Sequence, residues 1–134
     1  MQKRHSKSIS NWFKIKQSQK KECEQCNLFM NITETFNDPI DILFISLEQS
    51  GIEINKSIKL VGNEHNYILN LRGIIYLGAH HFTARIVTPD RNVWYHDGIS
   101  TGQSCLNEGY LSDFSKNSLM TCKGRQAVVV VYTK

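Results

Sequence analysis

A histidine and an aspartate on either side of a short turn are the residues of this chain best placed to do chemistry. The turn is predicted at Thr88–Asn92, where a proline and an aspartate favour a tight reversal. Centred on Asp90, it pairs the flanking runs as antiparallel strands and makes Asp97 the diagonal neighbour of His81, about 7–8 Å away between backbones. A carboxylate there can orient the imidazole and stabilise its charged form, as a general base serving a Ser or Cys nucleophile requires.

The same pairing predicts two different faces for this hairpin. We expect an apolar, buried face that contains Phe82, Ala84, Ile86 and Trp94. We expect a half-exposed face that contains His81, Thr83, Arg85, Tyr95 and Asp97. On that second face Arg85 is expected at a solvated strand position, with a substrate clamp as the alternative, and Tyr95 either lines a cleft beside His81 or does not. The alternative for the histidine and aspartate is a purely structural pair, because such pairs also occur outside active sites.

Length and hydropathy place the chain among globular proteins. Its 134 residues are 40% hydrophobic, which suits one domain or part of a larger one. The longest apolar run, Ala127–Tyr132, is too short to span a bilayer, so no membrane association is expected. Lys3, Arg4 and Lys7 are not followed by an apolar stretch, so we expect no secretory signal and an intracellular protein, in the cytoplasm or nucleus.

Charge is unevenly distributed along the chain. Residues 1–21 hold seven of the 16 Lys and Arg and none of the 12 acids. The other residues, with nine Lys and Arg and 12 acids, therefore carry a net charge of −3. We interpret residues 1–21 as a solvated, poorly ordered basic tail. A nucleic-acid patch is the alternative; because no nucleic-acid motif surrounds Trp12 and Phe13, we expect no nucleic-acid partner.

The cysteines suggest part of a metal site. Cys23 and Cys26 have the C-x-x-C spacing of half a tetrahedral zinc site. Cys105 and Cys122 are single, with 16 residues between them. The fold would have to bring all four thiols together; otherwise the pair is reduced and idle, or its partner ligands lie upstream of this chain.

The rest of the chain reads mainly as strands. Turn residues and apolar patterns predict a surface loop over residues 99–109 and a short helical turn over residues 110–114. The predicted fold class is α+β: five or six mostly antiparallel strands with little helix. Besides the hairpin, the expected strands are Ile40–Leu47, buried on both sides, Ile52–Leu60, Asn66–Leu77 and Gln126–Thr133, the last a central strand.

From Lys21 onward, the order of these features resembles the ubiquitin-specific proteases, specifically the C-terminal half of their catalytic domain. ECEQC resembles the second C-x-x-C of the zinc-binding fingers, and DPIDILFISLEQ the strand after it. NYILNLRGIIYLGAHHFTARI resembles the stretch with the catalytic histidine, NVWYHDG the strand that ends in the catalytic Asp or Asn, and QAVVVVYT the closing strand of the palm. About 110 of the 134 residues are covered.

This resemblance implies a fold and a division of roles. Residues 22–134 would form a partial catalytic domain, a finger remnant plus a mainly antiparallel palm. His81 would be the general base and Asp97 its orienting carboxylate; His80, Phe82 and Tyr95 would line the cleft. Cys23 and Cys26 would belong to a structural zinc site. Catalysis itself would need no cofactor. The partner would be ubiquitin or a ubiquitinated protein.

One part of the family pattern is absent from this sequence. The family's nucleophile lies in a cysteine box, Asn-x-Gly-Asn-Thr-Cys in form, upstream of the fingers, and no segment here resembles it. Cys105 and Cys122 follow the histidine, the reverse of the family order, so neither is expected to be the nucleophile. The resemblance therefore predicts the C-terminal portion of a cysteine-type deubiquitinase; the alternative is a non-catalytic ubiquitin-binding or degenerate palm fragment.

Overall fold

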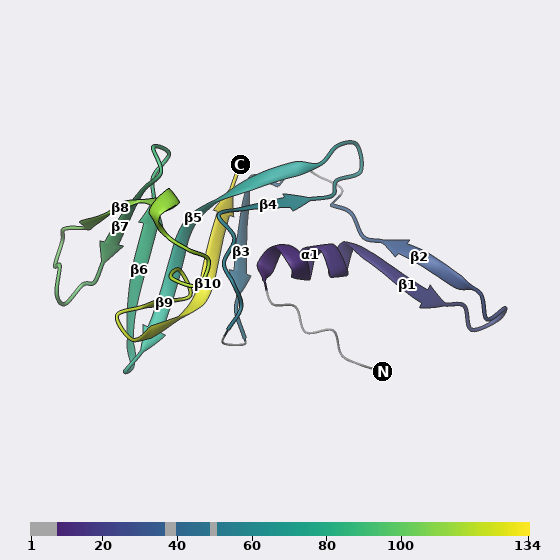
Figure 1. The fold of residues 1–134 in the computed structure, drawn as a ribbon, viewed down its shortest axis with the longest axis horizontal. Coiled ribbons are helices and arrows are strands. Elements are labelled where there is room, and N and C mark those ends of the chain that lie inside the picture. The colour runs from purple at the N-terminus through teal and green to yellow at the C-terminus, as the bar shows by residue number, and fades with distance from the viewer. Residues whose placement is uncertain (1–7, 37–39, 49–50) are drawn as a thin grey trace.

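An antiparallel sheet of eight strands dominates the computed structural model, which describes residues 8–36, 40–48 and 51–134 (Figure 1). Its strands are β3 (Ile42–Ser46), β4 (Ser57–Leu60), β5 (Tyr67–Gly78), β6 (His81–Val87), β7 (Asn92–His96), β8 (Leu106–Tyr110), β9 (Thr121–Cys122) and β10 (Arg125–Thr133). The other elements are helix α1 (Ile9–Gln17), the two-stranded ribbon β1 (Ser18–Glu22) and β2 (Phe29–Thr33), and the short 3-10 helix η1 (Leu111–Asp113). The predicted mostly antiparallel fold with little helix is confirmed.

The long strand β5 connects the halves of this sheet, whose order is β3-β10-β5-β6-β7-β8. Asn70 of β5 lies opposite Thr133 of β10 on one side and Ser57 of β4 on the other. On the β4 side, β6 takes over the pairing from Gly73 to Gly78. β10 lies between β3 and β5, so the predicted central position of the valine strand is confirmed.

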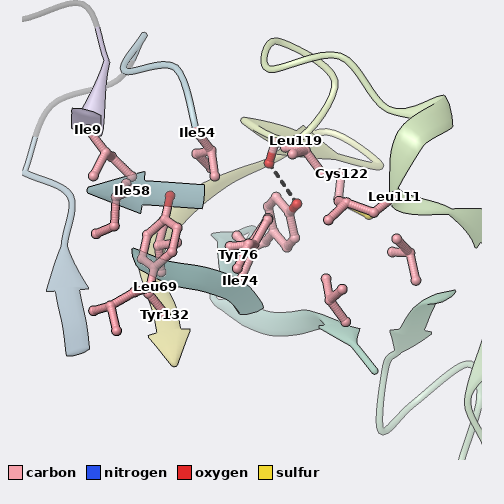
Figure 2. Close-up of a cluster of buried hydrophobic side chains, with 14 of the residues drawn as sticks. Ile9, Ile54, Ile58, Leu69, Ile74, Tyr76, Leu111, Leu119, Cys122 and Tyr132 are labelled. Carbon is pink, nitrogen blue, oxygen red and sulfur yellow. Dashed lines mark hydrogen bonds between the residues drawn. The ribbon is translucent and has the colours of Figure 1, made fainter. Parts of the chain in front are cut away.

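The buried face of the sheet is the reverse of the predicted one. Tyr95 and Arg85 are buried, at 2% and 8% exposure, whereas Phe82 and Ile86 are 60% and 42% exposed. Trp94 is partly exposed, so its assignment to the core is wrong. The reason is tertiary. Leu111, Leu119 and Cys122 belong to the buried core (Figure 2), and the segment of residues 111–122 that contains them, the covering segment, packs on the face of the sheet that carries Arg85 and Tyr95.

Two buried tyrosines, Tyr76 and Tyr132, keep their hydroxyl groups paired in this core, and Figure 2 shows both rings and the bond of Tyr76. Tyr76 donates to the Leu119 carbonyl at 2.7 Å, and Tyr132 donates to the Asn55 carbonyl at 2.6 Å. Both bonds join a strand to a loop that packs on it. Each large aromatic side chain therefore adds apolar burial without leaving an unpaired polar atom.

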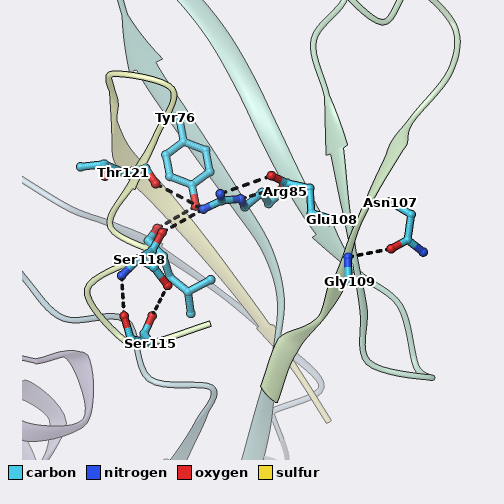
Figure 3. Close-up of polar contacts among 9 residues, drawn as sticks. Tyr76, Arg85, Asn107, Glu108, Gly109, Ser115, Ser118 and Thr121 are labelled. Carbon is cyan, nitrogen blue, oxygen red and sulfur yellow. Dashed lines mark hydrogen bonds and ion pairs between the residues drawn. The ribbon is translucent and has the colours of Figure 1, made fainter. Parts of the chain in front are cut away.

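Arg85 is the polar centre of the covered face, and not the solvated residue that was expected (Figure 3). Its Nε donates to Glu108 Oε1 at 2.9 Å and its Nη2 approaches Oε2 at 3.4 Å. Nη1 lies 3.1 Å from the Tyr76 hydroxyl and within 3.2 Å of the Ser118 and Thr121 carbonyls. The guanidinium thus joins β6 to β8 and to the segment that covers the sheet.

The interpretation of residues 1–21 as a poorly ordered tail is wrong for the part that forms helix α1. Residues 1–7 lie outside the described residues. Ser8 caps the helix by accepting the Asn11 N–H at 3.1 Å. Ile9, Phe13 and Gln17 recur every four residues and are buried on one side, a signal masked by the basic composition. In the described ranges, no helix has the length and apolar character needed to cross a membrane.

Two further expectations differ from the structure. β3 is an edge strand, and Phe44 is 65% exposed, so the prediction of burial on both sides is wrong. Residues 106–109 were expected within a loop and Tyr110 in a helical turn, but residues 106–110 form β8 against β7. Polar residues are tolerated in β8 because it lies at the opposite edge of the sheet, where one side of a strand meets water.

The Arg85 cluster predicts a large stability effect. Replacing Arg85 with Ala leaves the buried Tyr76 hydroxyl, the Glu108 carboxylate and the Ser118 and Thr121 carbonyls without this donor. We expect the free energy of unfolding to fall by about 3–5 kcal/mol in urea melts. Removal of an exposed charge from the covering segment, Lys116→Ala, is expected to change it by less than about 0.5 kcal/mol. Equal effects of the two substitutions would contradict the role given to Arg85.

Candidate functional site

The turn between β5 and β6 fixes the start of the candidate site. Gly78 pairs with His81, which leaves Ala79 and His80 as a two-residue turn. Their φ angles are +52° and +56°, as a type I′ hairpin turn requires. Neither residue is the glycine or asparagine that usually occupies such positions, so the turn is strained. It places His81 at the first position of β6, with its side chain on the covered face.

The turn between β6 and β7 places the aspartate. Thr88 donates its N–H to the Asn92 carbonyl at 3.0 Å, which confirms the predicted turn. Ala84 lies opposite His96, so the register is the predicted one. His81 Nε2 is 2.7 Å from Asp97 Oδ1, and the predicted proximity of these side chains is confirmed.

Asp97 is held as a carboxylate acceptor. Its Oδ1 also accepts the Ile99 N–H at 2.9 Å, and the Tyr95 hydroxyl lies 3.4 Å from its Oδ2. The bond with His81, followed by that with the Ile99 N–H, holds the Asp97 pKa well below its usual range. Asp97 is therefore ionised at neutral pH and able to stabilise a protonated His81 ring.

Thr101 is a residue of this site that the sequence interpretation missed. Its hydroxyl accepts the Asp97 N–H at 3.1 Å and donates to the Asp97 carbonyl at 2.8 Å. Its own N–H donates to that carbonyl at 2.8 Å. The available signal was a hydroxyl residue four positions after an aspartate at a strand end, a spacing at which side chains bond to nearby backbone.

The ring of His81 keeps one nitrogen for a further partner. Nε2 contacts Asp97, and this carboxylate is the hydrogen-bond partner of the ring within the described ranges. The side chain is 25% exposed, so the pair lies at the rim of the covered face. Such an arrangement can take a proton at Nδ1 from a nucleophile and return it to a leaving group.

The three residues expected to line a cleft are not brought together. Tyr95 is buried next to Asp97, with the Lys123 Nζ 4.5 Å from the centre of its ring. His80 lies in the exposed turn before His81. Phe82 is on the opposite face of β6, because side chains alternate along a strand. Only Tyr95 therefore contributes to the surroundings of the pair.

The single cysteines are not placed as nucleophiles. Cys122 is buried in the core, and this burial raises the pKa of its thiol, which favours the uncharged form. Cys105 is exposed ahead of β8. In the described part of the chain, no hydrogen bond joins either sulfur to His81.

The C-x-x-C pair lies at the tip of the ribbon formed by β1 and β2. Cys23 donates its N–H to the Leu28 carbonyl and accepts the Asn27 N–H, which closes the turn. The pKa of Cys23 is lowered by hydrogen bonds, first with the backbone N–H of Cys26, then with the Cys26 thiol and the Gln25 N–H. No group of three or more potential metal ligands occurs among the described residues, so the fold does not assemble all four cysteines into one site. The pair fits two of the four ligands of a structural zinc site.

Comparison with known proteins leaves the family open, because no protein-family model and no curated protein matches the chain. The contact between His81 and Asp97 is therefore the feature of this chain that bears most directly on its function.

The lowered pKa of Asp97 predicts a pH-dependent contribution to stability. The folded state binds fewer protons here than the unfolded chain, whose aspartate pKa is about 4. Asp97 thus stabilises the fold fully above that value and loses its contribution as pH falls towards the folded pKa. In urea melts, the stability difference between wild type and Asp97→Asn should be largest above about pH 5 and shrink towards pH 3.

An exposed aspartate provides the control for this measurement. Asp113→Asn removes the same charge from η1. The Asp97 contribution is contradicted if the two variants differ from wild type by the same amount at every pH.

Proposed function

We propose that this chain is the C-terminal portion of a cysteine-type deubiquitinase and carries the histidine and aspartate of its catalytic triad. The observation that supports this most directly is the 2.7 Å contact between His81 Nε2 and Asp97 Oδ1. Residues 22–134 would be a finger remnant followed by a palm. In support, a ribbon tipped by C-x-x-C precedes the hairpin, and a central valine strand follows it, in the order of the ubiquitin-specific proteases.

The reaction follows from the atoms that the pair presents. A cysteine thiolate attacks the isopeptide carbonyl after the ubiquitin C-terminal glycine, and His81 donates a proton from Nδ1 to the departing lysine amine. His81 then takes a proton from the water that hydrolyses the thioester and returns it to the departing thiol. Asp97 keeps Nε2 protonated and the ring oriented throughout. The described residues supply the base and its orienter, whereas the thiolate would come from elsewhere.

A second candidate function is a non-catalytic ubiquitin-binding palm. It is favoured by the positions of Cys122, buried in the core, and Cys105, which has no hydrogen bond to His81 in the described ranges. A base and orienter without a nucleophile hydrolyse nothing at a useful rate. Both candidates require ubiquitin as the partner, inside the cell in the cytoplasm or nucleus.

Ubiquitin binding tests the part common to both candidates. Titration of isotope-labelled ubiquitin with the full chain should shift the resonances of the ubiquitin C-terminal tail, since that segment would approach His81. His81→Ala should weaken these shifts. The matched control is His65→Ala, which alters an exposed histidine outside the candidate site. If ubiquitin resonances do not move at any concentration of the chain, the proposal is wrong.

A ubiquitin derivative with a C-terminal electrophile tests whether the chain is catalytic by itself. A covalent adduct that is lost in His81→Ala would identify the chain as an enzyme with one of its own thiols recruited, and Cys105→Ser would then show whether that thiol is Cys105. Binding without an adduct would show that the chain binds ubiquitin but is not catalytic by itself, so that any thiolate must come from elsewhere.

Metal binding tests the finger remnant. Cys23 and Cys26 would supply two thiolates, so reduced protein titrated with Co²⁺ should develop a thiolate-to-metal charge-transfer band. Cys26→Ser should abolish this band, whereas Cys105→Ser should leave it unchanged. A spectrum that depends equally on both cysteines would refute the assignment to the ribbon tip.

A further inference from the structure

We propose that Thr101 is the positioning residue of the candidate site and holds Asp97 in place for His81 through the Asp97 main chain. This inference rests on the proposed function for the role of the pair in catalysis. The positioning itself rests on hydrogen bonds within the turn that starts at Asp97 and ends at Thr101.

The sheet does not hold Asp97 in position. The last pair of the β6–β7 ladder is Ala84 with His96, and Asp97 lies one residue beyond it. The next two residues, Gly98 and Ile99, are exposed. A residue that leaves a ladder loses the hydrogen bonds that fix its backbone, so Asp97 needs other partners for its buried N–H and carbonyl.

Thr101 supplies those partners with one side chain. Its Oγ1 accepts from the Asp97 N–H and donates to the Asp97 carbonyl, and its own N–H binds the same carbonyl. Both main-chain polar groups of Asp97 are thereby satisfied, and the turn is closed at its two ends. The Asp97 side chain is left free for the Ile99 N–H and His81 Nε2.

This division of contacts explains how the carboxylate keeps its direction. Thr101 fixes the backbone from which the Asp97 side chain extends, and the closed turn holds the Ile99 N–H 2.9 Å from Oδ1. A carboxylate displaced by about 1 Å would lose a short bond to His81, because hydrogen bonds weaken steeply with distance and angle. Thr101 therefore acts on His81 without touching its ring.

Three variants of the full chain test the inference by proton NMR. Thr101→Val keeps the shape of the side chain and removes its hydroxyl, whereas Thr101→Ser keeps the hydroxyl. Thr83→Val is the matched control, because the Thr83 hydroxyl is buried on the same face of β6 and has no hydrogen-bond partner among the described residues. The readouts are the resonance of the proton on His81 Nε2 and the hydrogen-exchange rate of the Ile99 amide.

We expect Thr101→Val to broaden or remove the Nε2 proton resonance and to speed Ile99 exchange roughly tenfold. Thr101→Ser should restore both readouts, and Thr83→Val should change neither. If Thr101→Val does not fold, Thr101→Ala is compared with Thr101→Ser. The inference is wrong if folded Thr101→Val or Thr101→Ala retains both wild-type signals, or if Thr101→Ser loses them. These readouts need no ubiquitin, so their failure is distinct from a failure to bind it.

Discussion

The packing of the covering segment on the sheet depends on the hydrogen bonds of the buried Arg85 guanidinium. The guanidinium bonds Glu108 of β8, the Tyr76 hydroxyl of β5 and the Ser118 and Thr121 carbonyls of the covering segment. A buried charge is tolerated only when it is paired and hydrogen-bonded, and Arg85 meets that condition with a planar group that reaches several acceptors at once. Because these partners come from separate elements, the cluster holds the segment containing η1 and β9 against the sheet.

That covering segment determines the environment of the candidate site. His81, Arg85, Tyr95 and Asp97 share one face of the β6–β7 hairpin, and the segment buries the middle of this face but leaves its end accessible. Asp97, at this end, is nevertheless only 7% exposed, and hydrogen bonds from His81 and the Ile99 N–H stabilise its ionised form. His81 remains partly exposed, which a proton-transferring ring requires. The site therefore combines a buried carboxylate with a partly exposed imidazole at the edge of the covered face.

The other face of the sheet shows why apolar alternation was misleading. Phe44 lies opposite Val131, Val131 opposite Gly73, Gly73 opposite Ile86, and Ile86 opposite Trp94, so an apolar row crosses five strands. Such a row has the pattern of a core. Phe44 and Ile86 are nevertheless exposed, whereas the mixed polar face is covered. Alternation identifies two faces, but it cannot say which one another segment will cover, because that depends on contacts distant in sequence.

Local sequence by itself determined the antiparallel pairing, the turn at Thr88–Asn92 and the register that brings Asp97 to His81. These features depend on φ preferences and on the two-residue period of a strand, which act over a few residues. Only the tertiary structure decided the burial of Arg85 and the ordering of α1 against β4. Each of these requires a partner that is distant in sequence and whose position the fold supplies: Glu108 for Arg85, and the Val61 main chain for Gln17.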